Sequence, residues 1–337
     1  MSPTDLPEPS RPHPPRDRRG ELAYWIDRSL AFRFDPSDTL LVSGFWRSGT
    51  TWLQEALRDV LYAKTLFEPL CPLTRETQVL HAQHGVDGKS HEFLRLYMPF
   101  CGTEKVEGPL HEAFLQMLRG TSWGSWVRRF RKGLAESLRP RLVVKVVTAP
   151  LCLRAAQNTF GMPVLHVYRD PRAVIASTKK TRWHWLFDHL NLQEQLLDIP
   201  DGRGEYFAKW RDEILEYDRA DPVTRTAAYW SLTEKYLQES YAGYQGRFEC
   251  VSYEQLAQGR EPIFRSTLAQ LGLSPWHEHF RVPEADSTTT AVVQRGATVQ
   301  ERVEGWRTSL SSSEVAAIET IVSRFGLADR LTAGVNP

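Results

Sequence analysis

Residues 41–53 read LVSGFWRSGTTWL, an apolar run that passes through a glycine-containing turn into a helical pattern. Gly44 and Gly49 have the spacing of the phosphate-binding loop G-x-x-x-x-G-K-[ST], in which backbone N–H groups and a lysine surround phosphate oxygens. Thr50 stands at the lysine position, and the nearest cation, Arg47, comes three residues before it. The stretch therefore predicts an anion site at a helix N-terminus, built without the usual lysine.

Composition and charge limit the class of protein. The chain has 337 residues, 41% of them hydrophobic, and a formal net charge of +1, so we expect a globular protein without a nucleic-acid partner. The four cysteines lie far apart and fit free thiols in a reducing compartment. No apolar stretch is long enough to span a membrane, and no secretory signal is recognisable in residues 1–20, so we expect a cytoplasmic location.

Four short apolar runs, at 39–45, 141–147, 162–168 and 247–253, have the pattern of buried strands. The first three are each followed by a helical pattern. The sequence therefore predicts an α/β fold with a central parallel sheet flanked by helices. We expect a disordered Pro/Arg-rich tail at 1–20, and one domain at 21–337 with helical insertions at about 65–138 and 181–222. Within the first insertion, WGSWVRRFRKGLAESL at 123–138 predicts a surface helix whose basic face, with Arg128, Arg129, Arg131 and Lys132, is solvated. Contact of that face with an anionic acceptor is the less favoured alternative.

A second motif, VLHVYRDPRAVIAST, covers residues 164–178. Asp170 followed by Pro171 predicts a helix start, with the aspartate as N-cap and the proline at the first helical position. Arg169 is then placed at the end of the preceding strand, and Ser177 two helical turns further along, near the same end of the sheet.

Together these motifs resemble the sulfotransferase family, which uses 3′-phosphoadenosine-5′-phosphosulfate (PAPS). W-R-S-G-T-T-W resembles its 5′-phosphosulfate loop, and R-D-P-R-x-x-x-x-S its 3′-phosphate motif. FEPL at 67–70 is similar to a segment of the carbohydrate branch, and residues 294–310 are similar to the C-terminal region that closes over the nucleotide. The resemblance implies the P-loop-like sulfotransferase fold and transfer of a sulfuryl group from PAPS, without a metal, to a hydroxyl or amine of a small-molecule or carbohydrate acceptor.

The same resemblance implies a set of site residues. The catalytic group is Arg47, Glu68 and Lys145. The nucleotide-binding group is Arg47, Ser48, Gly49, Thr50, Thr51, Trp52, Arg169, Ser177, Arg295 and Gly296.

The catalytic base is less certain in this sequence, because Val147 stands where the cytosolic branch of the family has a histidine. Glu68 is the preferred candidate, since Pro69 is expected to hold it in an extended conformation that faces the sheet's carboxyl edge. A structural role for Glu68, paired with an arginine, is an equally weighted alternative. The other candidates for the base are Glu55, His81, His84, His111 and Glu112.

Other functions stay open at the level of the sequence. The glycine loop can be interpreted as a degenerate loop of a magnesium-dependent kinase or nucleoside triphosphatase, with Asp170 as the metal-binding aspartate. A non-catalytic nucleotide-binding module is a further alternative. Two histidine pairs, His81 with His84 and His277 with His279, suggest a metal site only weakly, because no carboxylate completes a ligand set.

Overall fold

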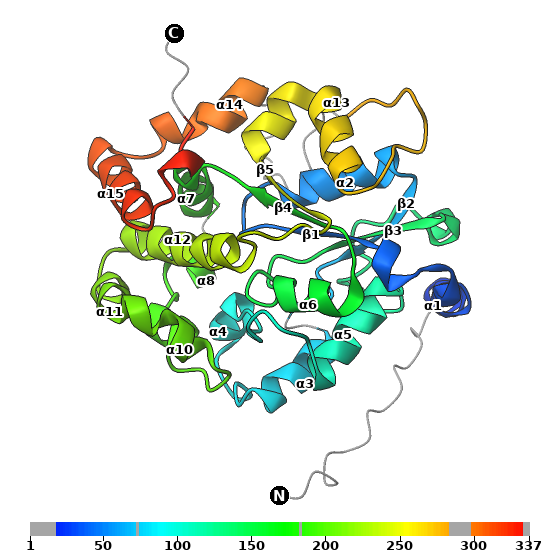
Figure 1. The fold of residues 1–337 in the computed structure, drawn as a ribbon, viewed down its shortest axis with the longest axis horizontal. Coiled ribbons are helices and arrows are strands. Elements are labelled where there is room, and N and C mark those ends of the chain that lie inside the picture. Colours follow the sequence, from blue (N-terminus) through cyan, green and yellow to red (C-terminus); the bar gives the residue numbers. More distant parts are fainter. Residues whose placement is uncertain (1–17, 72–73, 182–183, 283–297, 333–337) are drawn as a thin grey trace, which may run out of the picture.

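A computed structural model describes residues 18–71, 74–181, 184–282 and 298–332 of the chain. Five parallel strands form one sheet in the order β2-β3-β1-β4-β5 (Figure 1). The predicted α/β fold with a central parallel sheet is confirmed, and the four predicted runs each contain a strand. The strands are β1 (Leu40–Ser43), β2 (Ala63–Phe67), β3 (Arg141–Lys145), β4 (Val164–Tyr168) and β5 (Phe248–Ser252).

The register brings the carboxyl ends of the strands to one edge. Val42 of β1 lies beside Lys145, the last residue of β3, and Lys145 in turn lies beside Phe67, the last residue of β2. On the other side of β1, Tyr168 ends β4 next to Ser252, which ends β5. Side chains that follow these strands are therefore collected along a single edge, where ligands bind in open α/β sheets.

Strand β2 is a correction, because it occupies the start of the range 65–138, which the sequence analysis assigned to a helical insertion. Lys64, in the second position of this strand, interrupts the run of apolar residues by which a buried strand is recognised in a sequence. The lysine is nevertheless buried, with its Nζ 2.9 Å from a carboxylate oxygen of Asp27 and 2.8 Å from the carbonyl oxygen of Gly120. A buried lysine that is paired with an aspartate thus stands where a hydrophobic residue would have made the strand recognisable in the sequence.

Helices cover both faces of the sheet (Figure 1). On one face, α2 (Thr50–Val60) and α13 (Tyr253–Gln270) pack through leucines, alanines and Phe264 onto Val42, Val143 and Val167. On the other, α5 (Gly108–Leu118) and α6 (Leu153–Phe160) pack onto the opposite parity of the same strands. Burial on both faces explains why the central strands are apolar throughout.

The rest of the first insertion is only partly helical. It contains α3 (Arg75–Gln83), α4 (His91–Leu96), α5 and the 3₁₀ helix η3 (Leu134–Leu138). The predicted α-helix over 123–138 is wrong: residues 125–130 form turns, only 134–138 form a 3₁₀ helix, and Gly124 and Gly133 have φ of 148° and 127°, which no helix accommodates. The main-chain N–H of Phe67 instead donates to the carbonyl oxygen of Val127 at 2.9 Å, so this segment follows the end of β2.

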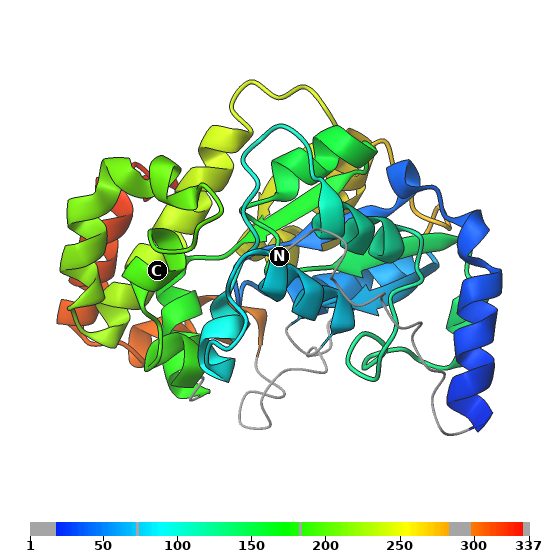
Figure 2. The same cartoon turned by 90° about the horizontal axis from the view of Figure 1, so that it is seen from below.

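A helical lobe adjoins the β5 side of the sheet. Its core combines aromatic and aliphatic side chains of the helices between 171 and 331, together with Phe45, Trp46 and Leu96. Figure 2 shows the lobe in green to red, at the opposite end of the molecule from the blue helix α1 (Arg18–Ser29). Its helices are α7 (Pro171–Lys180), α8 (His184–Phe187), α9 (Leu192–Leu196), α10 (Arg203–Phe207), α11 (Arg211–Asp218), α12 (Pro222–Ser240) and α15 (Ser312–Arg324).

Two short elements precede α15 along the chain, namely α14 (Val299–Glu304) and the 3₁₀ helix η6 (Gly305–Thr308). The remaining 3₁₀ turns are η1 (Ala31–Arg33), η2 (Pro36–Asp38), η4 (Ala208–Trp210) and η7 (Ala328–Arg330). At the other end of the chain, α1 begins at Arg18 and so overlaps the predicted tail 1–20, of which residues 1–17 lie outside the described part. Among the described helices, none has the length and hydropathy needed to cross a membrane.

Candidate active site

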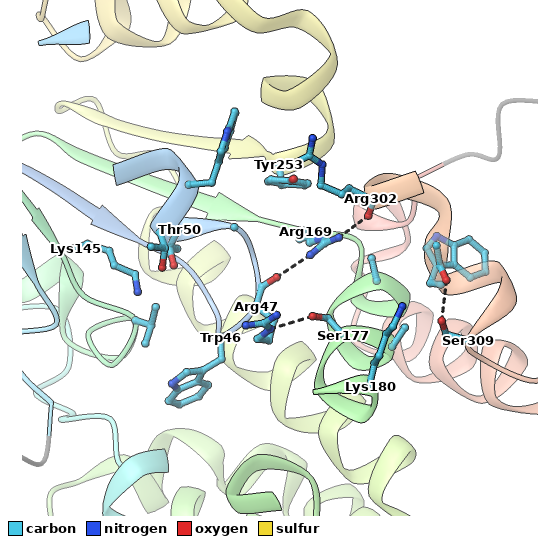
Figure 3. A pocket seen from close by; sticks show the side chains of 18 of the residues that line it. Trp46, Arg47, Thr50, Lys145, Arg169, Ser177, Lys180, Tyr253, Arg302 and Ser309 are labelled. Carbon is cyan, nitrogen blue, oxygen red and sulfur yellow. Dashed lines mark hydrogen bonds between the residues drawn. The ribbon is translucent and has the colours of Figure 1, made fainter. Parts of the chain in front are cut away.

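A cleft of about 900 Å³ opens at the carboxyl edge of the sheet, and every strand contributes to it. Arg47 follows β1, Glu68 follows β2, Lys145 ends β3, Arg169 follows β4 and Tyr253 follows β5. Figure 3 shows Lys145 and Thr50 on one side of the cleft, and Arg169, Ser177 and Lys180 on the other. The parallel register therefore brings together side chains that are up to about two hundred residues apart in the sequence.

The two glycines of the loop after β1 are required by close packing. A Cβ atom on Gly44 would lie 2.4 Å from the carbonyl oxygen of Val167, so the loop crosses tightly over β4. Gly49 has a φ of 84°, and a Cβ atom there would lie 2.4 Å from the ring of Tyr253. Any larger residue would push the loop away from the strand ends, so both glycines set the position of the helix that follows.

The first turn of α2 faces the cleft without a cap. Gly49 is its N-cap residue and has no side chain to accept from the first N–H groups, and the first turn carries no acidic residue. Thr50, Thr51 and Trp52 line the cleft, as does Gly49. Unsatisfied N–H groups at the positive end of a helix attract an anion. Ser48 is different, because it is buried, does not line the cleft, and its Oγ has no hydrogen-bond partner in the described part of the chain.

Arg47 projects from this loop toward α7. Its backbone has a φ of 67°, in the left-handed region that non-glycine residues seldom adopt. Its Nε donates to Oγ of Ser177 at 3.0 Å. Burial, and then the neighbouring charge of Arg169, lower the pKa of Arg47 to about 10. Two guanidinium groups held this close are stabilised by an anion between them.

Arg169 lies where the second motif placed it. Asp170 caps α7 by accepting from the N–H of Arg172 at 2.8 Å, which confirms the predicted helix start. The Arg169 guanidinium donates to the carbonyl oxygens of Arg47 at 3.1 Å and Arg302 at 2.6 Å, and it stacks 4.8 Å from the Tyr253 ring centre. Its Nε is buried without a partner in the described residues. Arg169 and Ser177 thus share a wall, and Arg47 contacts both.

Asp170 itself does not face the cleft. Its carboxylate is fully buried and accepts from the Arg172 guanidinium, at 2.6 Å for the closest pair, and from the hydroxyl of Thr332, also at 2.6 Å. Those donors occupy both oxygens. This counts against the interpretation of Asp170 as a magnesium-binding aspartate.

Glu68 and Lys145 form a buried ion pair on the cleft floor. Lys145 Nζ lies 2.5 Å from Oε1 of Glu68, and Oε2 of Glu68 accepts from the N–H of Val147 at 3.0 Å. Lys145 Nζ also lies 4.2 Å above the ring of Phe67. The extended conformation expected for Glu68 is wrong, since its φ is 48°, but its side chain does reach the cleft. A cation does pair with Glu68, but it is Lys145 rather than an arginine.

The other candidates for the base do not line the cleft. His81 packs against the ring of Tyr97, with centres 5.3 Å apart, and burial lowers its pKa to about 4. His84 bonds through Nδ1 to the Tyr97 hydroxyl. His111 packs against Phe160 at 5.0 Å. These contacts explain the histidines as packing residues of the insertion, and no metal-binding group of three or more His, Cys, Asp or Glu occurs in the described ranges.

The two acidic candidates besides Glu68 also lie elsewhere. Glu112 is on α5 and accepts from the side chain of Gln116 at 2.8 Å, and Glu55 lies on α2 outside the cleft. Glu68 is therefore the one predicted base that lines the cleft.

Several cleft residues were missed by the sequence analysis. Tyr253 could have been found, because it is the last residue of the predicted run 247–253, whose end had to meet the ends of the other strands. Lys180 lies three residues after Ser177 on the same side of α7. His91, Arg95 and Trp126 come from the insertion and carried no such signal, whereas Arg129 belonged to the basic face for which contact with an anionic acceptor was the less favoured alternative. The segment 298–310 lines the cleft through Arg302 and Trp306, among others, whereas Arg295 and Gly296 lie outside the described residues.

Comparison with known proteins gives no matching family model and no matching curated protein. Among solved structures, a sulfotransferase domain from the curacin biosynthetic pathway has 16% identity and a TM-score of 0.43, covering 85% of this chain and 97% of that one. Sulfotransferase STF1 from Mycobacterium tuberculosis H37Rv has 16% identity and a TM-score of 0.40, covering 91% and 82%.

Sulfotransferase STF9 from Mycobacterium avium has 14% identity and a TM-score of 0.35, covering 90% of this chain and 80% of that one. Such low TM-scores and identities do not decide what this chain does, so its function has to be derived from the residues of the cleft. These three solved structures to which the chain is similar are sulfotransferases.

Proposed function

We propose that this protein transfers a sulfuryl group from PAPS to a hydroxyl, or an amine, of a small-molecule or carbohydrate acceptor, in the cytoplasm. The observation that carries the proposal is the meeting of two anion sites in one cleft. One anion site is the uncapped start of α2, and the other is the wall formed by Arg169 and Ser177. Arg47 connects the two sites, because it lies in the loop that leads into α2 and contacts both Arg169 and Ser177. A nucleotide with phosphate groups on two sides of its ribose fits such a pair of sites.

The residues present fit the donor in three places. The N–H groups at the start of α2, with Thr50 and Thr51, suit the 5′-phosphosulfate. Arg169, whose buried Nε has no partner in the described residues, and Ser177 suit the 3′-phosphate. Trp52 and Tyr253, whose ring centres are 5.6 Å apart, offer aromatic faces beside them. We call this part of the cleft the donor half.

In the proposed reaction the donor supplies an activated sulfur, and the protein supplies charge and a proton acceptor. The acceptor oxygen forms a bond to sulfur while the bond from sulfur to the 5′-phosphate oxygen breaks, and that oxygen keeps the electron pair. Glu68 takes the proton from the acceptor hydroxyl. Arg47, the N–H groups of α2 and Lys145 stabilise the charge that grows on the leaving oxygen. As Glu68 becomes neutral, Lys145 loses its anionic partner and can turn fully toward that oxygen.

A magnesium-dependent phosphoryl transferase fits these residues less well. The loop lacks the lysine that contacts the β- and γ-phosphates in that class, and the carboxylate of Asp170 is occupied by Arg172 and Thr332. A non-catalytic nucleotide-binding module would need no buried Glu68–Lys145 pair on the cleft floor. That pair favours an enzyme.

The test begins with nucleotide binding. Calorimetry should give an affinity for 3′-phosphoadenosine-5′-phosphate at least about tenfold above that for ADP, since a charge-assisted hydrogen bond contributes roughly 1.5–3 kcal/mol. Labelled PAPS is then offered with a panel of phenols, sugars and amines, with and without EDTA. We expect transfer that EDTA leaves unchanged. Equal affinity for the two nucleotides, or activity that EDTA abolishes and magnesium restores, would contradict the proposal.

A further inference from the structure

The part of the cleft beyond the donor half contains a separate set of residues. They come from the end of β2, from the turns at 124–130, from α4 and from α8. We call this the acceptor half, and its members are Phe67, His91, Arg95, Trp126, Arg129 and Trp185. If the proposed function holds, an acceptor reaches Glu68 and Lys145 from here.

Aromatic rings form the walls of the acceptor half. The rings of Phe67 and Trp126 lie 5.7 Å apart on the side of β2. Trp185 packs edge-on against Trp46, with centres 5.8 Å apart, on the side of the helical lobe. Among the described residues that line the cleft, one has an amide side chain, namely Gln300 on α14. Walls of this kind suit a flat apolar ring.

Arg129 gives the acceptor half its charge. Its guanidinium lies 4.9 Å above the ring of Trp126 and 5.3 Å from the ring of Phe130. Within the described part of the chain it makes no side-chain hydrogen bond or ion pair. Arg131, two residues further on, pairs with Asp27 at 2.7 Å. Arg131 is thus neutralised by an ion pair, whereas Arg129, which lines the cleft, has no anionic partner among the described residues.

Arg95 adds a second cation to the acceptor half. It lies on α4, is exposed, lines the cleft, and has no side-chain hydrogen bond or ion pair among the described residues. The carboxylate nearest in the chain to this half, that of Glu68 on the cleft floor, is already paired with Lys145. An acceptor therefore meets two guanidinium groups that no carboxylate of the described residues neutralises.

We propose that the acceptor is a hydroxylated aromatic acid. Its ring lies between Trp126 and Trp185, and its hydroxyl reaches Glu68. Its anionic group is bound by Arg129, whose stacked guanidinium keeps its N–H groups available for a carboxylate, and by the exposed Arg95. This proposal rests on the proposed function for the reaction, but the ligand it names can be tested by binding alone.

The test compares two matched pairs of ligands by calorimetry, with 3′-phosphoadenosine-5′-phosphate present. The aromatic pair is 4-hydroxyphenylacetate and 4-methylphenol, and the sugar pair is methyl glucuronide and methyl glucoside. We expect 4-hydroxyphenylacetate to bind at least about tenfold more tightly than 4-methylphenol and more tightly than either sugar. Arg129→Gln should reduce that preference to less than about threefold, and Arg95→Gln should weaken it.

Arg128→Gln is the matched control. Arg128 stacks over Trp123 at 4.2 Å in the same segment but does not line the cleft, so the preference should persist. The inference is overturned if the neutral phenol binds as well as the acid, if the sugar acid binds best, or if Arg128→Gln removes the preference as fully as Arg129→Gln does. Binding of the acid that depends on Arg129, without any sulfated product from PAPS, would support this inference and contradict the proposed function.

Discussion

The donor half and the acceptor half of the cleft are built in different ways. Arg47, Arg169 and Ser177 follow strand ends and are linked to one another by hydrogen bonds of 3.0 and 3.1 Å. Arg95 and Arg129 come from the insertion and make no such bonds among the described residues. Residues fixed by the sheet suit a ligand that never changes, whereas residues on an insertion can change with the acceptor. This difference predicts that the two halves respond differently to mutation.

Arg47→Ala should produce the largest effect, because it removes a cation placed beside the developing charge. We expect kcat to fall about 10³-fold while the affinity for 3′-phosphoadenosine-5′-phosphate changes much less. Steady-state kinetics and calorimetry measure the two quantities, and Arg47→Lys should recover part of kcat. A normal kcat with a raised KM for PAPS would make Arg47 an anchoring group, and the donor half would then only bind.

Glu68→Gln tests whether the proton acceptor lies on the cleft floor, where the donor half meets the acceptor half. The amide can still accept from the N–H of Val147, so the fold should persist, but the proton acceptor is lost and kcat should fall about 10²-fold. Glu55→Gln, on α2 outside the cleft, is the control and should keep full activity. Full turnover in Glu68→Gln, together with loss in His91→Ala, would move the base from the floor to the acceptor half.

Arg169→Ala should lower only the preference for a nucleotide with a 3′-phosphate over one without it. Loss of a charge-assisted contact of roughly 1.5–3 kcal/mol should weaken 3′-phosphoadenosine-5′-phosphate by about tenfold or more. The affinity for ADP should stay nearly constant, because ADP has no 3′-phosphate. If calorimetry shows both nucleotides weakened equally, Arg169 supports the loop through the carbonyl oxygen of Arg47 instead of binding a phosphate.

His81, on α3, should make the part of the insertion next to the acceptor half sensitive to acid. Its folded-state pKa of about 4 lies below the unfolded value, so the unfolded chain binds the proton first and stability is lost as the pH falls below about 6.5. At pH 5 the loss should be about 2 kcal/mol. Hydrogen exchange should then speed up in α3 and α4 before it does in α2 and α7.

His81→Phe should reduce this acid-dependent step and leave the part that belongs to His84, whose pKa is also lowered by burial, whereas substitution of the exposed His189 by Gln should not change it. An acid-dependent step that persists undiminished in His81→Phe would point to another group. Equal acceleration of exchange in α2 would show that the two halves unfold together, contrary to the comparison above.

The donor half could be predicted from the sequence because its signals are local. A glycine turn after a strand, and Asp-Pro at a helix start, fix backbone geometry within a few residues, so Arg47, Arg169 and Ser177 could be placed before the structure was known. The sheet was predicted for the same reason, except for β2, whose Lys64 is paired with Asp27 from outside any local pattern.

The acceptor half depends on contacts between distant segments. Residues 123–138 have helical periodicity, but the carboxylate of Glu136 accepts from the main-chain N–H groups of Thr65 and Lys132, each at 3.0 Å, and two glycines break the helix. Glu68 was placed in the cleft by its likeness to a motif, yet its left-handed backbone and its pairing with Lys145 follow from the register of β2 against β3. Periodicity carries no information about either contact.

The ion pairs of Asp27 limit where the chain can be shortened. This carboxylate, on α1, lies 2.9 Å from Lys64 and 2.7 Å from Arg131, and all three side chains are almost fully buried. A chain trimmed to begin after α1 would keep both cations without their anion, at a cost of about 3–5 kcal/mol. Arg131, two residues after Arg129, would keep the hydroxyl of Ser137 as a partner but lose its carboxylate. For recombinant expression, the N-terminal boundary therefore belongs before Arg18, although the nearest residue of the phosphate-binding loop lies far beyond it.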